Sequence, residues 1–147
     1  MPADSSYAHL IAELGLALGI AGLAPSDEGI CQLVFDGRQV VQLVHVGARG
    51  LVLLSCRLAD HGIDARQAER MARANFLQAG RGVVLCAAPD GRPHMQVAQE
   101  LAGCTAATLC AALESLLDQA ESWSRAQART ADPASGGRDP AFFLQSV

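Results

Sequence analysis

The sequence contains no lysine, and all eleven of its cationic residues are arginines. The arginines are scattered along the chain, and fifteen acidic residues bring the net charge to −4. Nucleic-acid binding requires concentrated positive charge, which replaces the counterions around the phosphate backbone. The composition therefore argues against nucleic acid as a partner.

Long hydrophobic runs are also missing. The apolar stretch Leu14–Ala24 is shorter than the roughly 20 residues that cross a bilayer. It lacks the flanks of a signal peptide, because no cation precedes Arg38, and Asp4 and Glu13 precede or adjoin the stretch. Five cysteines, an odd number without an export signal, fit reduced thiols rather than a disulfide framework. We expect a cytoplasmic protein that makes no membrane contact.

Motifs for catalysis and for metal binding are absent from the sequence. Its four histidines stand far apart, without a second ligand at the spacing of a zinc site. They are His9, His45, His61 and His94. Neither a nucleophile elbow nor a Gly-rich phosphate loop occurs. Cys31, Cys56 and Cys86 fall in apolar runs, where free cysteine behaves as a small hydrophobic residue. The sequence predicts a protein that is not an enzyme and holds no metal and no cofactor.

What the chain does have is apolar content, which makes up 50% of its 147 residues. That is enough for one domain to bury a core without disulfides or metal. We expect this domain to span residues 1–128. Residues 129–147 are rich in Thr, Asp, Pro, Ser and Gly, which predicts a flexible tail, although Phe142-Phe143-Leu144 near its end is apolar again.

Apolar periodicity predicts three helices and five strands. The helices are expected over Ser5–Leu23, after the N-cap Asp64 to about Gln78, and after the N-cap Thr105 to about Ala126. The expected strands are Ile30–Phe35, Gln39–Val46, Leu51–Cys56, Val83–Ala87 and His94–Gln99. Asp36-Gly37 between the first two strands is a strong hairpin signal. The predicted fold is α+β, with a twisted antiparallel sheet and the order α-β-β-β-α-β-β-α.

The predicted elements carry more apolar surface than one covered face needs. The strand Leu51–Cys56 is apolar on both faces, and Leu16, Ile20 and Leu23 form a second stripe on the first helix. A sheet covered by helices on one side leaves its other side wet. A second subunit, a bound segment or the chain's own helices could cover it. Exposed contiguous apolar surface usually marks an interaction site.

A set of positions between Tyr7 and Trp123 carries a family resemblance together with the order of elements. They are Leu14-Gly15, Leu18-Gly19, Leu23, Gly29, Cys31, Leu33, Asp36, Asn75-Phe76, Gly82, Leu85, Asp90 and Val97. In these features the chain resembles the class I type III secretion chaperones, the family that includes the Tir and Yop effector chaperones.

The resemblance implies a function and two contact surfaces. The protein would be a bacterial homodimer that binds the N-proximal segment of a type III effector and keeps it soluble and competent for secretion. Implied effector-binding residues are Leu16, Ile20, Leu33, Phe35 and Leu43. Implied dimer-interface residues are Met71, Asn75, Phe76, Val84 and Cys86. The secretion ATPase is a further candidate partner.

Two other classes of protein stay open at this stage. A non-secretory α/β regulatory or ligand-sensing module would show a closed pocket and stabilisation by its ligand. An enzyme that uses Cys or His would lose its activity when Cys31, Cys56 and Cys86 are replaced. A binding chaperone would lose only packing energy at those positions.

Overall fold

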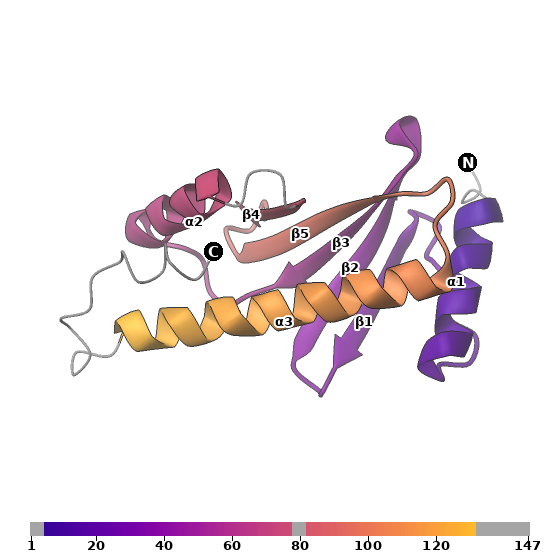
Figure 1. Ribbon diagram of the computed structural model, residues 1–147, viewed down its shortest axis with the longest axis horizontal. Coiled ribbons are helices and arrows are strands. Elements are labelled where there is room, and N and C mark those ends of the chain that lie inside the picture. The colour runs from indigo at the N-terminus through magenta and orange to yellow at the C-terminus, as the bar shows by residue number, and fades with distance from the viewer. Residues whose placement is uncertain (1–4, 78–81, 132–147) are drawn as a thin grey trace.

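A computed structural model describes residues 5–77 and 82–131, which form three helices and one five-stranded sheet (Figure 1). The helices are α1 (Ser5–Leu18), α2 (Ala65–Leu77) and α3 (Ala106–Ala131). The strands are β1 (Ile30–Phe35), β2 (Gln39–Val46), β3 (Leu51–Arg57), β4 (Val83–Ala87) and β5 (Pro93–Glu100), with a 3-10 turn at Gly47–Arg49. The predicted α+β class and the predicted order of elements are confirmed.

The sheet is antiparallel throughout, in the order β1-β2-β3-β5-β4. Strands β1 to β3 form a meander, and the predicted turn between β1 and β2 is confirmed. Asp36 and Gly37 both adopt positive φ, at 53° and 69°. This left-handed pair matches the right-handed twist of the strands it joins. Strands β1 and β4 are the two edges of the sheet.

Both predicted N-caps are confirmed by reciprocal hydrogen bonds. The backbone N–H of Gln67 donates to Oδ1 of Asp64 at 2.8 Å, and the N–H of Asp64 donates to Oε1 of Gln67 at 3.0 Å. Thr105 and Thr108 exchange similar bonds at the start of α3. Each pair satisfies backbone donors that a helix start leaves without an intrahelical partner.

Helix α1 is shorter than predicted and ends at Leu18 rather than at Leu23. Gly19 adopts φ +73° and donates its N–H to the carbonyl of Leu16 at 3.3 Å. The next N–H, of Ile20, donates to the carbonyl of Gly15 at 2.7 Å. These two hydrogen bonds form a Schellman C-cap. The sequence did not indicate it, because the apolar residues after Gly19 continue the spacing of a helix face. The prediction that Leu16, Ile20 and Leu23 share one helix face was wrong.

Leu23 folds back over the end of α1 instead of continuing it. A Cβ on Gly15 would lie 2.7 Å from Cβ of Leu23 and 2.8 Å from the carbonyl oxygen of Ile20. Only glycine fits at this crossing, because real Cβ atoms essentially never come so close to other atoms. Leu23 therefore packs against the core and is removed from the predicted second stripe.

Helix α3 is longer than predicted and runs to Ala131 rather than to about Ala126. It therefore enters the segment predicted as a tail from residue 129. The remainder of that segment, with Phe142-Phe143-Leu144, lies outside the described residues, as does the predicted end of α2 at Gln78.

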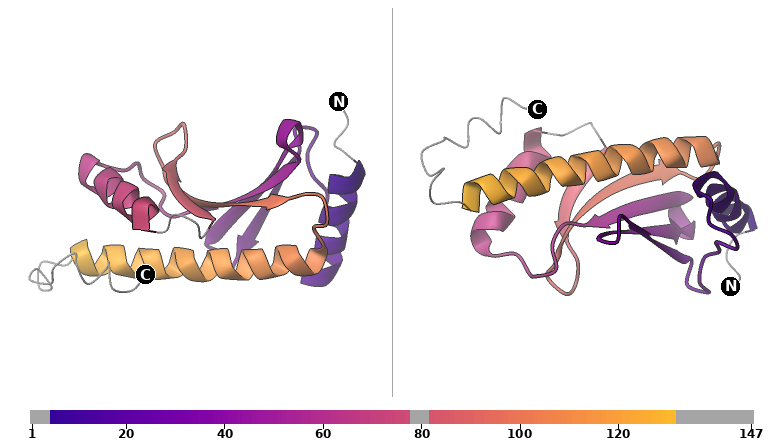
Figure 2. Two further views of the ribbon diagram at one scale, coloured as in Figure 1. Left: turned by 45° about the horizontal axis from the view of Figure 1, so that its top comes forward. Right: turned by 90° about the horizontal axis from the view of Figure 1, so that it is seen from below.

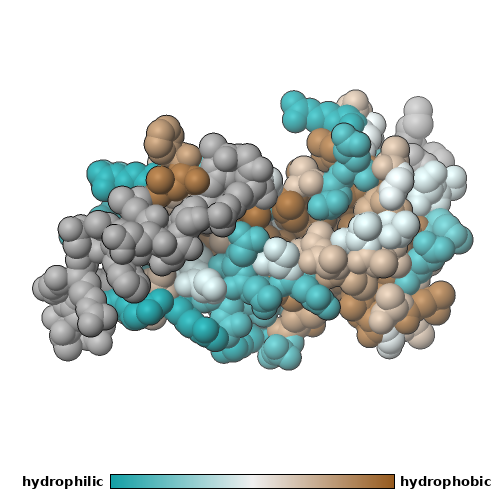
Figure 3. Space-filling model, in the orientation of Figure 1, coloured by the Kyte–Doolittle hydropathy of each residue, from teal (hydrophilic) through white to brown (hydrophobic). Residues whose placement is uncertain are grey.

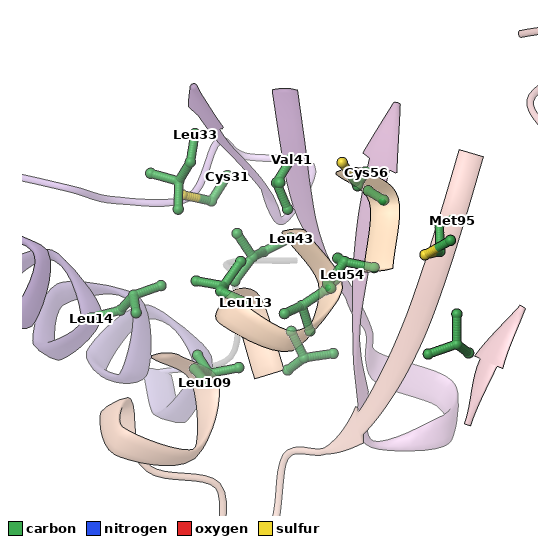
Figure 4. Close-up of a cluster of buried hydrophobic side chains, with 14 of the residues drawn as sticks. Leu14, Cys31, Leu33, Val41, Leu43, Leu54, Cys56, Met95, Leu109 and Leu113 are labelled. Carbon is green, nitrogen blue, oxygen red and sulfur yellow. The ribbon is translucent and has the colours of Figure 1, made fainter. Parts of the chain in front are cut away.

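The core lies between one face of the sheet and the helices α1 and α3, which cross each other on that side (Figures 1 and 2). Figure 4 shows Leu14 of α1 and Leu109 and Leu113 of α3 facing inward-pointing side chains of the strands. Those strand residues are Cys31, Leu33, Val41, Leu43, Leu54, Cys56 and Met95. We call this side the inner face, and the opposite side, which carries no helix over β1–β3 in Figure 2, the outer face.

Candidate protein-binding surfaces

Cys31, Cys56 and Cys86 have the properties of packing residues rather than of nucleophiles. Burial raises the pKa of Cys56 to about 11 and also raises the pKa values of Cys31 and Cys86. A thiol is reactive as its thiolate, so these groups are protonated and inert near neutral pH. Within residues 5–77 and 82–131, no three His, Cys, Asp or Glu side chains form a group that could hold a metal ion.

One hydroxyl–imidazole pair has the spacing of a catalytic dyad. Oγ of Ser55 lies 3.1 Å from Nδ1 of His94, and Nε2 of Gln96 donates to the same hydroxyl at 3.3 Å. Desolvation is the main reason that the pKa of His94 is lowered. The nearby carboxylate of Asp90 acts in the opposite direction on this pKa, and it accepts a hydrogen bond from the backbone N–H of Arg92. Ser55 is buried in β3 between two paired strands, with its backbone inside the ladder. The arrangement is a structural hydrogen bond across the sheet.

The first candidate surface is the end of α1. The side chain of Leu16 is 80% exposed and that of Ile20 is 40% exposed. Both reach the surface even though Ile20 lies beyond the end of the helix. The C-cap bonds the backbone N–H of Ile20 to the last turn of α1. Leu16 and Ile20 are therefore both held at this end of the helix. Large exposed apolar side chains at a rigid helix end are suited to protein contact. We call Leu16 and Ile20 the α1 surface.

Strand β1 provides an open edge. The backbone of Ile30 is bonded to Ser26, through its N–H to Oγ at 3.2 Å and through its carbonyl to the N–H at 2.8 Å. Ile30 thus directs its backbone groups away from β2. Strand geometry repeats every two residues, so Gln32 and Val34 direct theirs the same way. The side chain of Val34 is also 54% exposed. An edge strand of this kind is a template for another extended segment.

The structure separates the five predicted effector-binding residues into two groups. Leu16, Ile20 and the half-buried Phe35 reach the surface. Leu33 and Leu43 are buried in the core beneath α1 and α3 and are inaccessible in this subunit. Sequence reasoning missed Val34, although the alternation of β1 assigns it to the face opposite Leu33.

The second candidate surface lies at the other end of the sheet. Phe76 of α2 is 82% exposed and Val84 of β4 is 50% exposed, and Leu77 adds to them. We call these three residues the α2–β4 surface. Figure 3 shows hydrophobic side chains over α2 that are separate from those around the lower part of α1. Of the other predicted interface residues, Cys86 is half-buried and Met71 lies in the core.

Asn75, also predicted at the interface, joins α2 to β4 within the subunit. Its Nδ2 donates to the carbonyl of Leu85 at 2.8 Å, and its Oδ1 accepts from the N–H of Leu85 at 2.7 Å. Both edge-facing backbone groups of Leu85 are therefore occupied by one side chain. The edge at β4 is closed at this position, in contrast to the open edge at β1.

Solved structures with the same fold include three complexes between two proteins. A chain in the crystal structure of the ExsC-ExsE complex is 25% identical, with a TM-score of 0.75, covering 85% of this chain and 96% of that chain. A chain in the ExoT-SpcS complex from Pseudomonas aeruginosa is 25% identical, with a TM-score of 0.60, covering 81% and 97%. A chain in the crystal structure of the Yersinia pestis type III secretion chaperone SycH in complex with a fragment of YscM2 is 19% identical, with a TM-score of 0.63, covering 79% and 98%.

No curated protein sequence matches the chain significantly. A family profile does match it, over residues 9–124, which is more than half of the chain. This range begins in α1, includes the whole sheet and ends in α3. The chain therefore belongs to the Tir chaperone protein (CesT) family.

Proposed function

We propose that this protein is a cytoplasmic chaperone that binds the N-proximal segment of a bacterial type III secretion effector and keeps it soluble and secretion-competent. Its family is one of chaperones, and two similar structures are complexes, of ExsC with ExsE and of SpcS with ExoT. The observation that carries the proposal is the pair of apolar surfaces that remain outside a complete core. The same family membership speaks against an enzyme, and binding alone requires no cofactor.

The effector would bind along the edge of β1 and on the α1 surface. An extended segment beside β1 gains main-chain hydrogen bonds from Gln32 and Val34, and its alternate side chains contact apolar residues. Leu16, Ile20 and Phe35 supply those contacts, and we add Val34 to them. Each well-buried apolar anchor contributes about 1.5–3 kcal/mol before ordering costs. Leu33 and Leu43 would support the binding residues from the core.

The homodimer would form through the α2–β4 surface, with Met71, Asn75 and Cys86 behind it. Because Asn75 occupies the backbone of Leu85, two subunits would associate there by packing side chains rather than by pairing their β4 strands. The secretion ATPase is a proposed further partner of the effector-loaded dimer. In this scheme the effector and the second subunit use opposite ends of the sheet, so both can bind at once.

The test is the double substitution Leu16→Asp/Ile20→Asp with an effector co-expressed from a neighbouring gene. Two buried or partly buried charges at the contact should reduce co-purification at least tenfold, because each costs more than about 1.4 kcal/mol when left unpaired. Protease protection of the effector's N-proximal region should be lost as well. The variant should keep its circular dichroism spectrum and its dimeric mass.

The matched control is Ala12→Asp/Ala21→Asp, which adds the same charge at exposed positions of the same region. It should bind the effector as the unmodified protein does. An α1 double variant that is folded and still protects the effector would contradict the proposal. An unfolded variant would show instead that Leu16 and Ile20 stabilise the domain. In that case the single variant Leu16→Ser would be compared with the unmodified protein in the same co-purification and protease assays.

A further inference from the structure

A row of neutral polar side chains crosses the outer face of the sheet. Gln32 of β1 lies opposite Gln42 of β2, Gln42 opposite Ser55 of β3, and Ser55 opposite Gln96 of β5. Nε2 of Gln42 donates to Oε1 of Gln32 at 3.3 Å, and Nε2 of Gln96 donates to Oγ of Ser55 at 3.3 Å. We call these four residues the polar strip. They form two hydrogen-bonded pairs, one on each half of the row.

Apolar side chains lie on both sides of the polar strip over β1 and β2. On one side, Ile30 is paired with Val44, which is in turn paired with Leu53 of β3. On the other side, Val34 is paired with Val40. Each flanking row is two residues away along the strands, a distance of about 7 Å. Over β1 and β2 the outer face is therefore apolar, polar and apolar along the direction of the strands, whereas β3 and β5 carry Arg57 and His94 beyond Ser55 and Gln96.

The polar strip restricts what can cover this face. Burying a carboxamide without a partner costs about 1–3 kcal/mol, so a purely apolar cover is disfavoured there. The hydrogen bond between Gln42 and Gln32 uses one donor and one acceptor, which leaves Oε1 of Gln42 and the amide of Gln32 able to bond a ligand. Neither group is charged, so the matching ligand group is a neutral one.

The shape of the face restricts the ligand's conformation. Away from the edges of a sheet, a covering segment finds no strand partner for its backbone N–H and C=O groups. A helix satisfies these groups internally. At a rise of 1.5 Å per residue, its side chains at i, i+4 and i+7 lie about 6 Å and 4.5 Å apart along one face, and the outer two can reach the flanking rows about 7 Å from the polar strip.

We propose that the outer face binds an amphipathic helix of the effector that places a neutral hydrogen-bonding residue, Asn, Gln, Ser or Thr, on the polar strip between two apolar residues. This inference rests on the proposed function and adds a sequence requirement to its client. Gln32 and Gln42 are then the residues that determine specificity. The helix continues the effector's contact from Val34, which belongs both to the β1 edge and to this face.

An effector helix fits this face better than a second subunit does. Permanent subunit interfaces resemble a protein core and are mainly apolar. The α2–β4 surface has that character, and its Val84 lies opposite Gln96 at the β4 end of the outer face. At the other end, over β1 and β2, Gln32 and Gln42 divide the outer face. A neutral polar row suits a partner that must also be released, because its hydrogen bonds can return to water.

The experiment uses a displayed library of 18-residue helical peptides on an Ala/Glu/Lys background, randomised at three positions spaced i, i+4 and i+7. It is selected against the full protein and against Gln32→Leu/Gln42→Leu. The unmodified protein should select an apolar, a neutral polar and an apolar residue in that order. Replacing the central residue of a selected peptide by Leu should weaken binding about five- to tenfold, and the leucine variant should reverse this preference.

Three further variants make the outcome specific. Gln119→Leu removes a glutamine that bonds a serine hydroxyl on α3, away from the outer face, and should leave the selection unchanged. Val44→Arg should abolish peptide binding if the peptide lies on the outer face. Gln42→Glu keeps the shape of the side chain and can be used if the leucine variant fails to fold. It should shift the selected central residue to Lys or Arg.

Selection of an apolar central residue by the unmodified protein, or binding that survives Val44→Arg, would overturn the inference. Failure to select any peptide would also count against it. None of these outcomes decides whether an effector co-purifies through Leu16 and Ile20. The proposed function is thus tested separately from this inference.

Discussion

Cys56 illustrates how single residues of the core set the protein's pH response. Its side chain is 1% exposed on the inner face, and desolvation raises the pKa of the thiol to about 11. Burial likewise raises the pKa of Tyr7, whose hydroxyl donates to the carbonyl of Leu43 at 3.1 Å. For both groups the folded state favours the protonated form, so each contributes stability that is complete below its unfolded pKa and is lost as the pH rises.

We predict that the free energy of unfolding falls between about pH 9 and pH 11 and that Cys56→Ala reduces this fall by about 1–2 kcal/mol. In that window the thiol ionises in the unfolded chain but stays protonated in the folded one. Urea denaturation at pH values on both sides of the window measures the effect. Val52→Ala is the control, because it removes a buried neighbour on β3 without removing a titrating group. Equal pH slopes for the two variants would refute the assignment to Cys56.

At the scale of elements, the hydrogen bonds of Asn75 decide how α2 meets the sheet. We predict that Asn75→Leu lowers the free energy of unfolding by about 2 kcal/mol, because both backbone groups of Leu85 lose a partner. Hydrogen exchange at the amide of Leu85 should accelerate more than at Leu54 in the central strand. Gln119→Leu, which breaks an exposed helical contact, should change stability little. Unchanged exchange at Leu85 would contradict this role.

The elements also show where sequence reasoning succeeded. Strands β1, β2 and β4 begin and end where alternation and turn residues predict, because both signals are local. The end of α1 was missed, since Ile20 and Leu23 continue the helical spacing while Gly19 supplies the C-cap that stops it. Gly15 gave a signal, because a glycine inside a helix often marks a close approach.

The candidate site was predicted only in part, for a different reason. Leu16, Phe76 and Val84 are exposed as expected of contact residues. Leu33 and Leu43 were assigned to a groove but lie in the core, because local alternation shows that a strand has two faces without showing which one the helices cover. That choice depends on α3, which is more than fifty residues away in the sequence.

At the scale of the whole molecule, the two apolar surfaces are separate, which suggests that one binds the effector and the other binds the second subunit. Strand β1 is at one end of the sheet order, with α1 on its side of the molecule, and β4 is at the other end, with α2 beside it (Figure 1). A change at one end should therefore leave the function of the other intact, because effects of distant sites without shared partners are usually additive. This independence can be tested in both directions with charged substitutions.

We predict a dimer of twice 15.3 kDa that Phe76→Glu/Val84→Glu converts to a monomer. Repeated by twofold symmetry, the two substitutions place four carboxylates in an apolar contact, which should weaken association at least a hundredfold. Light scattering across a concentration series measures the mass. Ala68→Glu, at an exposed position of α2 eight residues before Phe76, should leave the dimer intact, as should Leu16→Asp/Ile20→Asp. A dimer that survives the double glutamate variant would place the interface elsewhere, and the outer face of the sheet would then be the next surface to test.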